Sequence, residues 1–436
     1  MKKILLIGQF TDISGYGNAV RCYLSNLIEL ENEGLIDLKI LNYSFEEKIG
    51  ASEQELEEIK KRSLTKSLLH RSGMCDDEAE YARVQEYMDG GDYEVIMCLT
   101  SDMLGHGEDN NKSKFIVDIP GYPEHNGPRF NIRQICRSSR GVNQCIAWES
   151  DSIPLVWRDS ILDKSINVKK LICTCDWNRD TFSELGIESV TIPFSMNFEE
   201  NIDEEYYKKV EKVTKDKFVF SSVFQWSPRK GTDILLKAFA LEFARNDDVC
   251  LIMKTYLNKA FVGAAQKETA EFKKQIKIIN SSLLHLNHRF VPKFKTVIIN
   301  DILTKKQLNS IYKRSDAFVL PTRGEGFCLP AAEAISCETP AIMPNIGGHL
   351  GYMDTSDNNR LLIDSRMEPC ENMHNHLWSS IDIDWVEPSL KSTREKIRFA
   401  YENRETCKTI GKEQNTYMRN YLSKERCVSL FKKHLL

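Results

Sequence analysis

Short apolar runs alternate with longer amphipathic segments along most of the chain. The runs are rich in Val, Ile and Leu, which is typical of buried strands. In the first half they read KILLIGQ, LKILNY, YEVIMCL, KFIVDI, QCIAW and KLICTC, and in the second half FVFSSVF, VCLIMKT, DAFVLP, TPAIMP and NRLLID. Helices are expected at residues 18–31, 52–71, 232–245, 260–281, 305–314, 331–337 and 389–420. This alternation predicts an α/β protein with parallel sheets and helices on both faces.

One charged stretch interrupts the alternation. From residue 198 it reads FEENIDEEYYKKVEKVTKD, which is poor in apolar residues and precedes a fresh strand. A chain of 436 residues also exceeds what one hydrophobic core usually serves. We therefore expect two doubly wound, Rossmann-like domains, residues 1–196 and 217–420, joined by a linker over residues 197–216. The last segment, residues 421–436, is predicted as a helix that can cross back to the first domain.

Composition narrows the class of protein. The hydrophobic share of 41% and the charged share of 28% are ordinary for a globular protein, and no apolar run is long enough to cross a membrane. The net charge of −4 gives no global reason to expect nucleic acid or membrane binding. The 13 cysteines form no CxxC pair, which favours reduced thiols. These features indicate a cytoplasmic protein.

The most informative segment is RGEGFCLPAAEAISCETP, residues 323–340. We expect a strand to end near Pro321 and a helix to begin at Pro330, because proline needs no amide donor at that position. The positive end of such a helix attracts anions. Glu325 precedes the loop and Glu333 is expected in the first helical turn, and a carboxylate can accept from both hydroxyls of a diol. A diphosphate between two sugars would satisfy all of these groups; the alternative is two ordinary helix-start acids.

Two further segments carry weaker phosphate signals. In FVFSSVFQWSPRKGTDILLKAFALEF, residues 218–243, Arg229 and Lys230 directly precede a predicted helix. Cations there can neutralise a departing diphosphate, although a solvated basic turn would look the same. In QFTDISGYGNAV, Gly15 and Gly17 allow a ligand to approach the backbone closely, or serve only a tight turn. Residues 347–348, a Gly-Gly pair, follow another predicted strand.

These segments together resemble a known family. EGFCLPAAEA resembles the E-x7-E motif of the retaining nucleotide-sugar glycosyltransferases with the GT-B fold, family 4 or group 1 type. PRKGTDILLKAF, PNIGGH, SGYG, IAWESDSIPLVW, DWNRDTFSELGI and DWVEPS (residues 384–389) also fit that family. The resemblance implies two Rossmann-like domains facing across a cleft. It also implies transfer of a sugar, with retained configuration, from a nucleoside diphosphate sugar to a hydroxyl of a glycan, a lipid-linked or another anionic acceptor.

The resemblance also implies roles for individual residues. Glu333 would hold the nucleotide ribose, and Lys230 would bind the diphosphate. Glu325, with the amides of three residues that follow it, would hold the donor sugar and phosphate; these residues are Phe327, Cys328 and Leu329. Gly15 and Gly17 would approach the same diphosphate from the first domain. No metal or other cofactor is implied, because protein cations do that work.

The sequence departs from the family pattern at three places. Phe224 and Gln225 stand where many members have an arginine, so Arg229 and Lys254 are the candidates for a second phosphate cation. Cys328 replaces a usual glycine and would narrow the sugar pocket. A histidine is common in the first domain near the transferring carbon. Here Glu149 and His125 are the candidates, and we add both to Lys230 and Glu325 as the candidate catalytic residues.

The acceptor is less readable. In RFNIRQICRSSR successive arginines are separated by four, four and three positions, so a helix would place them on one face. They are Arg129, Arg133, Arg137 and Arg140. A second basic stretch covers residues 60–71. Such faces fit a phosphorylated lipid at a membrane surface, with peripheral membrane contact, or a modified nucleic acid, or they are solvated surface helices. A non-catalytic nucleotide-sugar or glycan-binding protein on the same fold is a further alternative.

Overall fold

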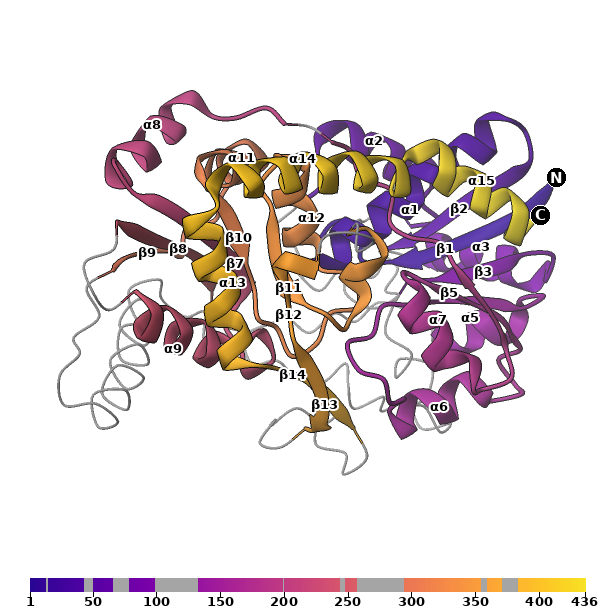
Figure 1. Ribbon diagram of the computed structural model, residues 1–436. Coiled ribbons are helices and arrows are strands. Elements are labelled where there is room, and N and C mark those ends of the chain that lie inside the picture. Colours follow the sequence, from indigo (N-terminus) through magenta and orange to yellow (C-terminus); the bar gives the residue numbers. More distant parts are fainter. Residues whose placement is uncertain are drawn as a thin grey trace. The chain divides into compact units, whose positions relative to one another are not determined.

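The structure is a computed structural model that describes residues 1–12, 15–42, 50–65, 78–98, 132–198, 200–243, 248–256, 294–353, 359–370 and 383–436. Its contacts divide the chain into two compact units (Figure 1). Unit 1 comprises Met1–Trp148, Ser152–Met196 and Leu422–Leu436, and unit 2 comprises Glu149–Asp151 and Asn197–Tyr421. The chain thus returns to unit 1 at its end, and three residues from the first half of the sequence group with unit 2.

Unit 1 alternates strands and helices as the apolar pattern predicts. Its strands are β1 (Lys2–Gly8), β2 (Ile36–Asn42), β3 (Glu94–Met97), β4 (Val142–Ile146), β5 (Val168–Cys173) and β6 (Glu188–Thr191). Its helices are α1 (Gly15–Asn32), α2 (Glu53–Arg62), α3 (Glu78–Asp89), α5 (Ile132–Ser138), α6 (Leu155–Leu162), α7 (Asp176–Ser183) and α15 (Lys424–Leu435). In the described part of the unit, all six strands pair in parallel in the order β2-β1-β3-β4-β5-β6.

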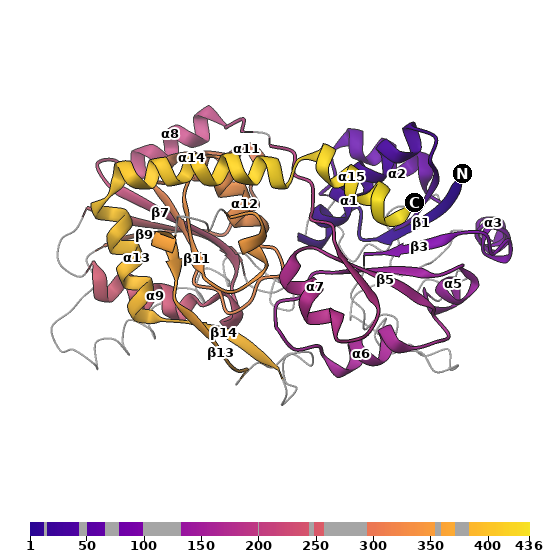
Figure 2. The same cartoon turned by 45° about the vertical axis from the view of Figure 1, so that its right-hand side comes forward.

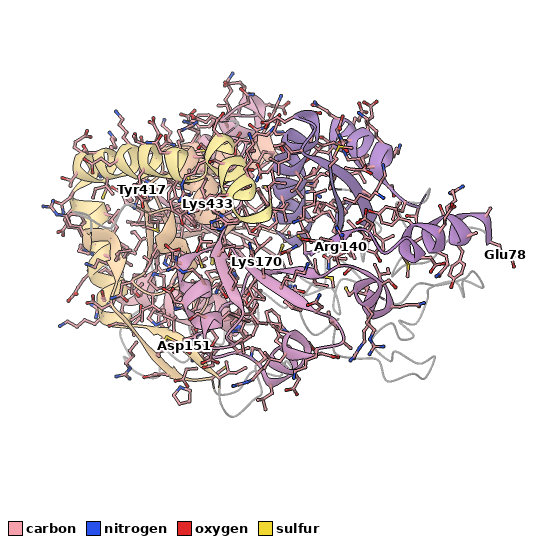
Figure 3. The ribbon with its side chains drawn as sticks, turned by 90° about the vertical axis from the view of Figure 1, so that its right-hand side faces the viewer. Glu78, Arg140, Asp151, Lys170, Tyr417 and Lys433 are labelled. Atoms are coloured by element: carbon pink, nitrogen blue, oxygen red, sulfur yellow. The ribbon has the colours of Figure 1, made fainter. Side chains whose placement is uncertain are left out.

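Burial explains the apolar runs of unit 1. Residues 4–7 of β1 are all buried, because a parallel sheet is covered on both faces. The final helix α15 lies along α1 (Figures 1 and 2), where the ring of Phe431 packs edge-on against Tyr23 at 5.3 Å. Lys170 of β5 donates a hydrogen bond to the carbonyl of His434, and Figure 3 labels Lys170 close to Lys433 on α15. The C-terminal helix is therefore an integral part of unit 1.

Unit 2 is a second doubly wound unit. Its strands are β7 (Phe218–Gln225), β8 (Val249–Tyr256), β9 (Lys295–Ile299), β10 (Ala317–Val319), β11 (Ala341–Pro344), β12 (Leu362–Ile363), β13 (Ser365–Pro369) and β14 (Asp384–Pro388). Its α-helices are α8 (Glu204–Val213), α9 (Thr232–Glu242), α11 (Lys305–Arg314), α12 (Leu329–Ser336), α13 (Leu390–Glu402) and α14 (Arg404–Tyr421). Short 3-10 turns are η1 (Pro228–Lys230), η3 (Gly348–Gly351) and η4 (Asn359–Leu361).

The strand order of unit 2 places its candidate site. Among the described residues the main sheet runs β12-β11-β10-β7-β8-β9, with parallel pairing throughout. The order reverses between β7 and β10, so the loops that leave the carboxyl ends of these two strands lie next to each other. Such a reversal point is where doubly wound folds bind ligands. An antiparallel pair, β13 with β14, extends from the unit (Figure 2).

Several expectations need correction. The charged stretch predicted as a linker contains α8, which Asp203 caps by accepting from the amide of Tyr206, and it belongs to unit 2. The helix expected over residues 389–420 is two helices, α13 and α14, separated at Asn403. Sequence pattern did not reveal α8, because a short amphipathic helix rich in charge resembles a linker. It did not reveal the boundary between α13 and α14, because no proline or glycine interrupts the helical periodicity there.

Other expectations are met or fall outside the described residues. The helix over residues 305–314 is α11 with the same bounds, and a capping box of Thr304 and Gln307 begins it. The strand expected at residues 114–119 and the helix expected at 260–281 lie outside the described residues. Across the described ranges, no helix has the length and apolar character needed to cross a membrane. The cysteines in those ranges are free thiols.

Candidate active site

The turn between β7 and α9 carries the two predicted cations. Strand β7 ends at Gln225, and η1 presents Arg229 and Lys230 directly before α9 begins at Thr232. Between them, Gly231 adopts a left-handed backbone with φ of 63°. A Cβ on Gly231 would lie 1.7 Å from the carbonyl oxygen of Pro321, so only glycine lets this turn lie against the end of the neighbouring strand β10.

The segment between β10 and α12 carries the predicted glutamates. Residues 320–328 are all buried, and Glu325 is only 5% exposed. Helix α12 begins at Leu329, one residue earlier than expected, so Pro330 is its second residue. Glu333 therefore lies in the second turn of the helix and not in the first, as the sequence led us to expect. Cys328 caps the helix with φ of 68°, a left-handed backbone that is rare for a residue with a side chain.

A buried ion pair joins these two segments. The ammonium of Lys230 donates a hydrogen bond to the carboxylate of Glu325, and the two side chains are 13% and 6% exposed. Burial alone would raise the pKa of Glu325, but the charges of Lys230 and Arg229 outweigh it and hold that pKa below its ordinary value of 4.5. At neutral pH the site therefore holds an ionised carboxylate against a cation, at the point where the strand order reverses.

Arg229 is held by two further groups. Its Nη1 donates to the carbonyl of Gly324 at 2.6 Å, and its Nη2 lies 3.3 Å from Oε1 of Glu149. A Cβ on Gly324 would lie 2.4 Å from the carbonyl oxygen of Glu149, so glycine allows the two backbones to touch. Glu149, a candidate catalytic residue from the loop after β4, is thus brought to Arg229 of unit 2. Its carboxylate balances the charge of Arg229.

The Gly-Gly pair after β11 supports the same segment. The amide of Gly348 donates to the carbonyl of Glu325 at 2.8 Å. The hydroxyl of Tyr352 donates to the carbonyl of Cys328 at 2.8 Å, and its ring lies 5.0 Å from that of Phe327. Burial lowers the pKa of His349, so this imidazole is neutral at pH 7 and its Nε2 donates to Pro344 at 2.7 Å. Two hydrogen bonds from residues 348–352 therefore hold the backbone at Glu325 and Cys328.

Glu333 faces helix α11. Its Oε1 accepts from Lys305 at 2.7 Å and its Oε2 lies 3.2 Å from the hydroxyl of Tyr312. The Glu333 side chain is 15% exposed and the Lys305 side chain is 38% exposed, so the ion pair is partly open to solvent. Sequence pattern alone does not predict these two partners, because they lie on a different helix, α11.

Part of unit 2 resembles a known protein family. Residues 203–369, which lie within unit 2, match the sequence model of the family described as glycosyl transferases group 1. This part of the chain is therefore similar to the group 1 glycosyltransferases. The matched residues include Arg229, Lys230, Glu325 and Glu333. No curated protein sequence matches the chain.

Solved structures resemble the whole chain. Anabaena Alr3699/HepE, in complex with UDP and glucose, has 12% sequence identity and a TM-score of 0.61, over 100% of this chain and 99% of that chain. A glycosyltransferase from Rickettsia africae has 13% identity and a TM-score of 0.60, over 100% and 97%. A UDP-forming trehalose-phosphate synthase from Burkholderia xenovorans has 11% sequence identity and a TM-score of 0.59, over 99% of this chain and 98% of that chain. At these identities the likeness establishes the fold, and the predicted GT-B fold is confirmed.

Gly15, Gly17 and His125 lie outside the matched residues 203–369, whereas Lys254 lies within them, on β8. Gly15 and Gly17 begin α1 of unit 1. Gly17 has a packing reason of its own, since a Cβ there would lie 2.1 Å from the carbonyl oxygen of Asp12. Their proposed approach to the donor diphosphate stays a prediction. His125 lies outside the described residues.

The arginines predicted as one basic face are largely neutralised where they are described. Arg133 pairs with Asp163, Arg137 donates to the hydroxyl of Ser165 at 3.1 Å, and Arg140 pairs with Asp92 at 3.0 Å. Helix α5 ends at Ser138, so Arg140 lies beyond it, and the expected single helical face is wrong for this residue. Arg129 lies outside the described residues. In the second basic stretch, Arg62 is 3% exposed and pairs with Glu31 and Glu58, while residues 66–71 are not described.

The backbone at Cys328 leads to the first prediction. A side chain in the left-handed region costs about 1–2 kcal/mol, which glycine avoids. Cys328→Gly and Cys328→Ala both remove the buried thiol, but only the glycine variant removes the strain. After allowing for the greater unfolded-state entropy of glycine, we expect Cys328→Gly to be more stable than Cys328→Ala by about 1 kcal/mol in urea denaturation. Equal stabilities would show that the left-handed backbone costs nothing.

Proposed function

We propose that this protein transfers a glycosyl group from a nucleoside diphosphate sugar to an acceptor hydroxyl with retained anomeric configuration. The observation that carries the proposal is the buried pair of Lys230 and Glu325, at the reversal point of a unit that is similar to the group 1 glycosyltransferases. A cation before α9 and an ionised carboxylate before α12 suit a ligand with a phosphate at one end and hydroxyls at the other. UDP-glucose is the first donor to test, because structurally similar proteins bind UDP or UDP-glucose.

Each step of the reaction has a group to serve it. The bond between the anomeric carbon and the diphosphate oxygen breaks, and Lys230 neutralises the negative charge that grows on the leaving group. Glu325 accepts from hydroxyls of the donor sugar and so orients it. The acceptor oxygen bonds to the anomeric carbon on the same face, and its proton passes to the departing diphosphate. Neither a side-chain nucleophile nor a metal takes part, so activity should survive EDTA.

Glu149 has a narrower role in this proposal. Its carboxylate holds Arg229, and both lie beside the segment that ends in Glu325. Arg229 is thus partly neutralised by Glu149, as Lys230 is by Glu325, and both cations are candidates to meet the diphosphate. The candidate role of Glu149 at the transferring sugar carbon stays a proposal. It is tested by Glu149→Gln, which keeps the size of the side chain and removes its charge.

The same neutralisation favours one alternative. If Arg229 contributes little, the domain could bind a nucleotide sugar without transferring it. Release of the nucleoside diphosphate separates the two functions. Purified protein with UDP-glucose and other nucleotide sugars, in the presence of a panel of hydroxyl acceptors, should release the diphosphate, and proton NMR of the product should show the donor's anomeric configuration. Binding with no release across the panel would favour the alternative.

Glu333 supplies the second prediction. If its carboxylate holds the ribose equally in the ground state and the transition state, Glu333→Gln should raise the donor KM about tenfold and leave kcat nearly unchanged. The matched control is Glu395→Gln on α13, an exposed glutamate beside Lys391, which should change neither constant. A fall in kcat with an unchanged KM would contradict the ribose assignment.

A further inference from the structure

We propose that Arg323 is a positioning residue for the transfer reaction, which sets where Lys230 and Glu325 lie relative to each other. This inference rests on the proposed function. Arg323 lies between β10 and α12, two residues before Glu325, and its side chain is 9% exposed. The resemblance to the E-x7-E family assigns Arg323 no role.

Every N–H group of the Arg323 guanidinium is used. Its Nη1 donates to the carbonyl of Pro228 and to Oδ1 of Asp233, both at 2.8 Å. Its Nη2 donates to Oδ2 of Asp233 and to Oε1 of Glu387, both at 3.1 Å. Its Nε donates to Oε2 of Glu387 at 2.5 Å. Arginine has five N–H donors, and all five are satisfied, so Arg323 keeps none for a donor phosphate. It must act through the groups that it holds.

The groups it holds are those that shape the site. Pro228 begins the turn η1 that ends in Lys230, and Asp233 lies in the first turn of α9. The backbone of Arg323 repeats the connection, because its amide donates to the carbonyl of Arg229 at 2.6 Å. Side chain and backbone therefore join the turn that carries Lys230 to the segment that carries Glu325.

Contacts with Arg323 also give a role to the DWVEPS segment, residues 384–389, which contributes no predicted residue to the donor site. Glu387 pairs with Arg323, the ring of Trp385 covers the guanidinium at 4.9 Å from Cζ, and the amide of Val386 donates to the Arg323 carbonyl at 2.9 Å. Strand β14 thus forms the third side of the cluster. Planar stacking and two forked carboxylate bonds need a guanidinium, and lysine cannot reproduce them.

Electrostatics adds a second reason. Burial alone would raise the pKa of Asp233, but its bonds to Arg323 lower it below the ordinary value, so this carboxylate is ionised at neutral pH. Without Arg323, the charges of Asp233 and Glu387 would lose their shared partner beside the turn where the diphosphate is expected. They would then repel the donor as well as release the turn.

The test is Arg323→Lys against Arg398→Lys. Arg398 is a matched control in unit 2: its Nε lies 2.8 Å from Glu242, its Nη2 donates to a carbonyl at 2.8 Å, and its Cζ stacks 4.8 Å from the ring of Phe243. Both variants should lose thermal stability. Arg323→Lys should also lower kcat for release of nucleoside diphosphate from UDP-glucose by about ten- to 100-fold, because small misplacements of reacting groups cost this much. Arg398→Lys should keep kcat within about twofold.

Milder variants cover the case in which Arg323→Lys does not fold. Glu387→Gln keeps the side-chain size and removes one bonding charge, and Glu242→Gln does the same to the control cluster. Glu387→Gln should lower kcat at least about threefold more than Glu242→Gln does. If the wild-type protein is active and Glu387→Gln and Glu242→Gln have equal kcat values, the positioning role of Arg323 is overturned and the proposed function stands. A wild-type protein that neither binds nor turns over nucleotide sugars would overturn the proposed function and this inference with it.

Discussion

Replacing Lys230 with methionine is expected to lower kcat for donor turnover by about 100- to 1,000-fold. Methionine keeps most of the length and apolar character of the side chain and removes the charge. In the proposed reaction, negative charge grows on the leaving diphosphate, and Lys230 is the buried cation at the start of α9 that can meet it. Because this charge is larger in the transition state than in the bound donor, kcat should fall more than donor affinity.

A matched variant tests the position of the charge. Lys217 lies directly before the other end of β7, where it pairs with Asp248 at 3.2 Å, and Lys217→Met should leave kcat within about twofold. Circular dichroism and thermal unfolding establish that both variants fold. If Lys230→Met raised KM strongly and kept kcat, Lys230 would bind the donor without serving the chemical step.

The sequence predicts the parts of this site that depend on local pattern. The turn before α9 and the loop before α12 follow buried β-branched strands, so their places at the carboxyl ends of β7 and β10 can be derived from periodicity and from the glycine and proline positions. Lys230 and Glu325 could therefore be named in advance. Their contact could not, because it depends on β10 pairing with β7, which are separated by some ninety residues of chain.

The missed features are those set by distant polar partners. Arg323 reads as one more charge in a loop, and only the fold brings Asp233 and Glu387 to it. Glu149 follows a strand of unit 1, yet its contacts group it with unit 2. Hydrophobic periodicity records which faces are buried and carries no information on which charges meet inside them. An arginine directly before the glycines of RGEG, residues 323–326, is the sequence feature that could have directed attention to Arg323.

Replacing Glu325 with glutamine is expected to lower kcat by about 100-fold and to destabilise the fold by about 3 kcal/mol. Glutamine has the same shape, so the sugar would still find an acceptor oxygen, but Lys230 would lose the charge that holds it in place. Removing one partner of a buried ion pair lowers the free energy of unfolding more than removing both, because the remaining charge is left without a counter-charge. The double variant Lys230→Met with Glu325→Gln should therefore be less destabilised than the sum of the single variants.

The pH dependence of stability gives an independent measure of the same pair. Since the folded-state pKa of Glu325 lies below the ordinary value of 4.5, its ionised form stabilises the native state above that pH. This contribution is lost as the pH falls from about 4.5 through the lower folded-state pKa. The difference in unfolding free energy between wild type and Glu325→Gln should therefore be constant between about pH 7 and about pH 5 and shrink at lower pH. A difference that grew on acidification would mean that the pKa of Glu325 is raised and that burial, not Lys230, governs the carboxylate.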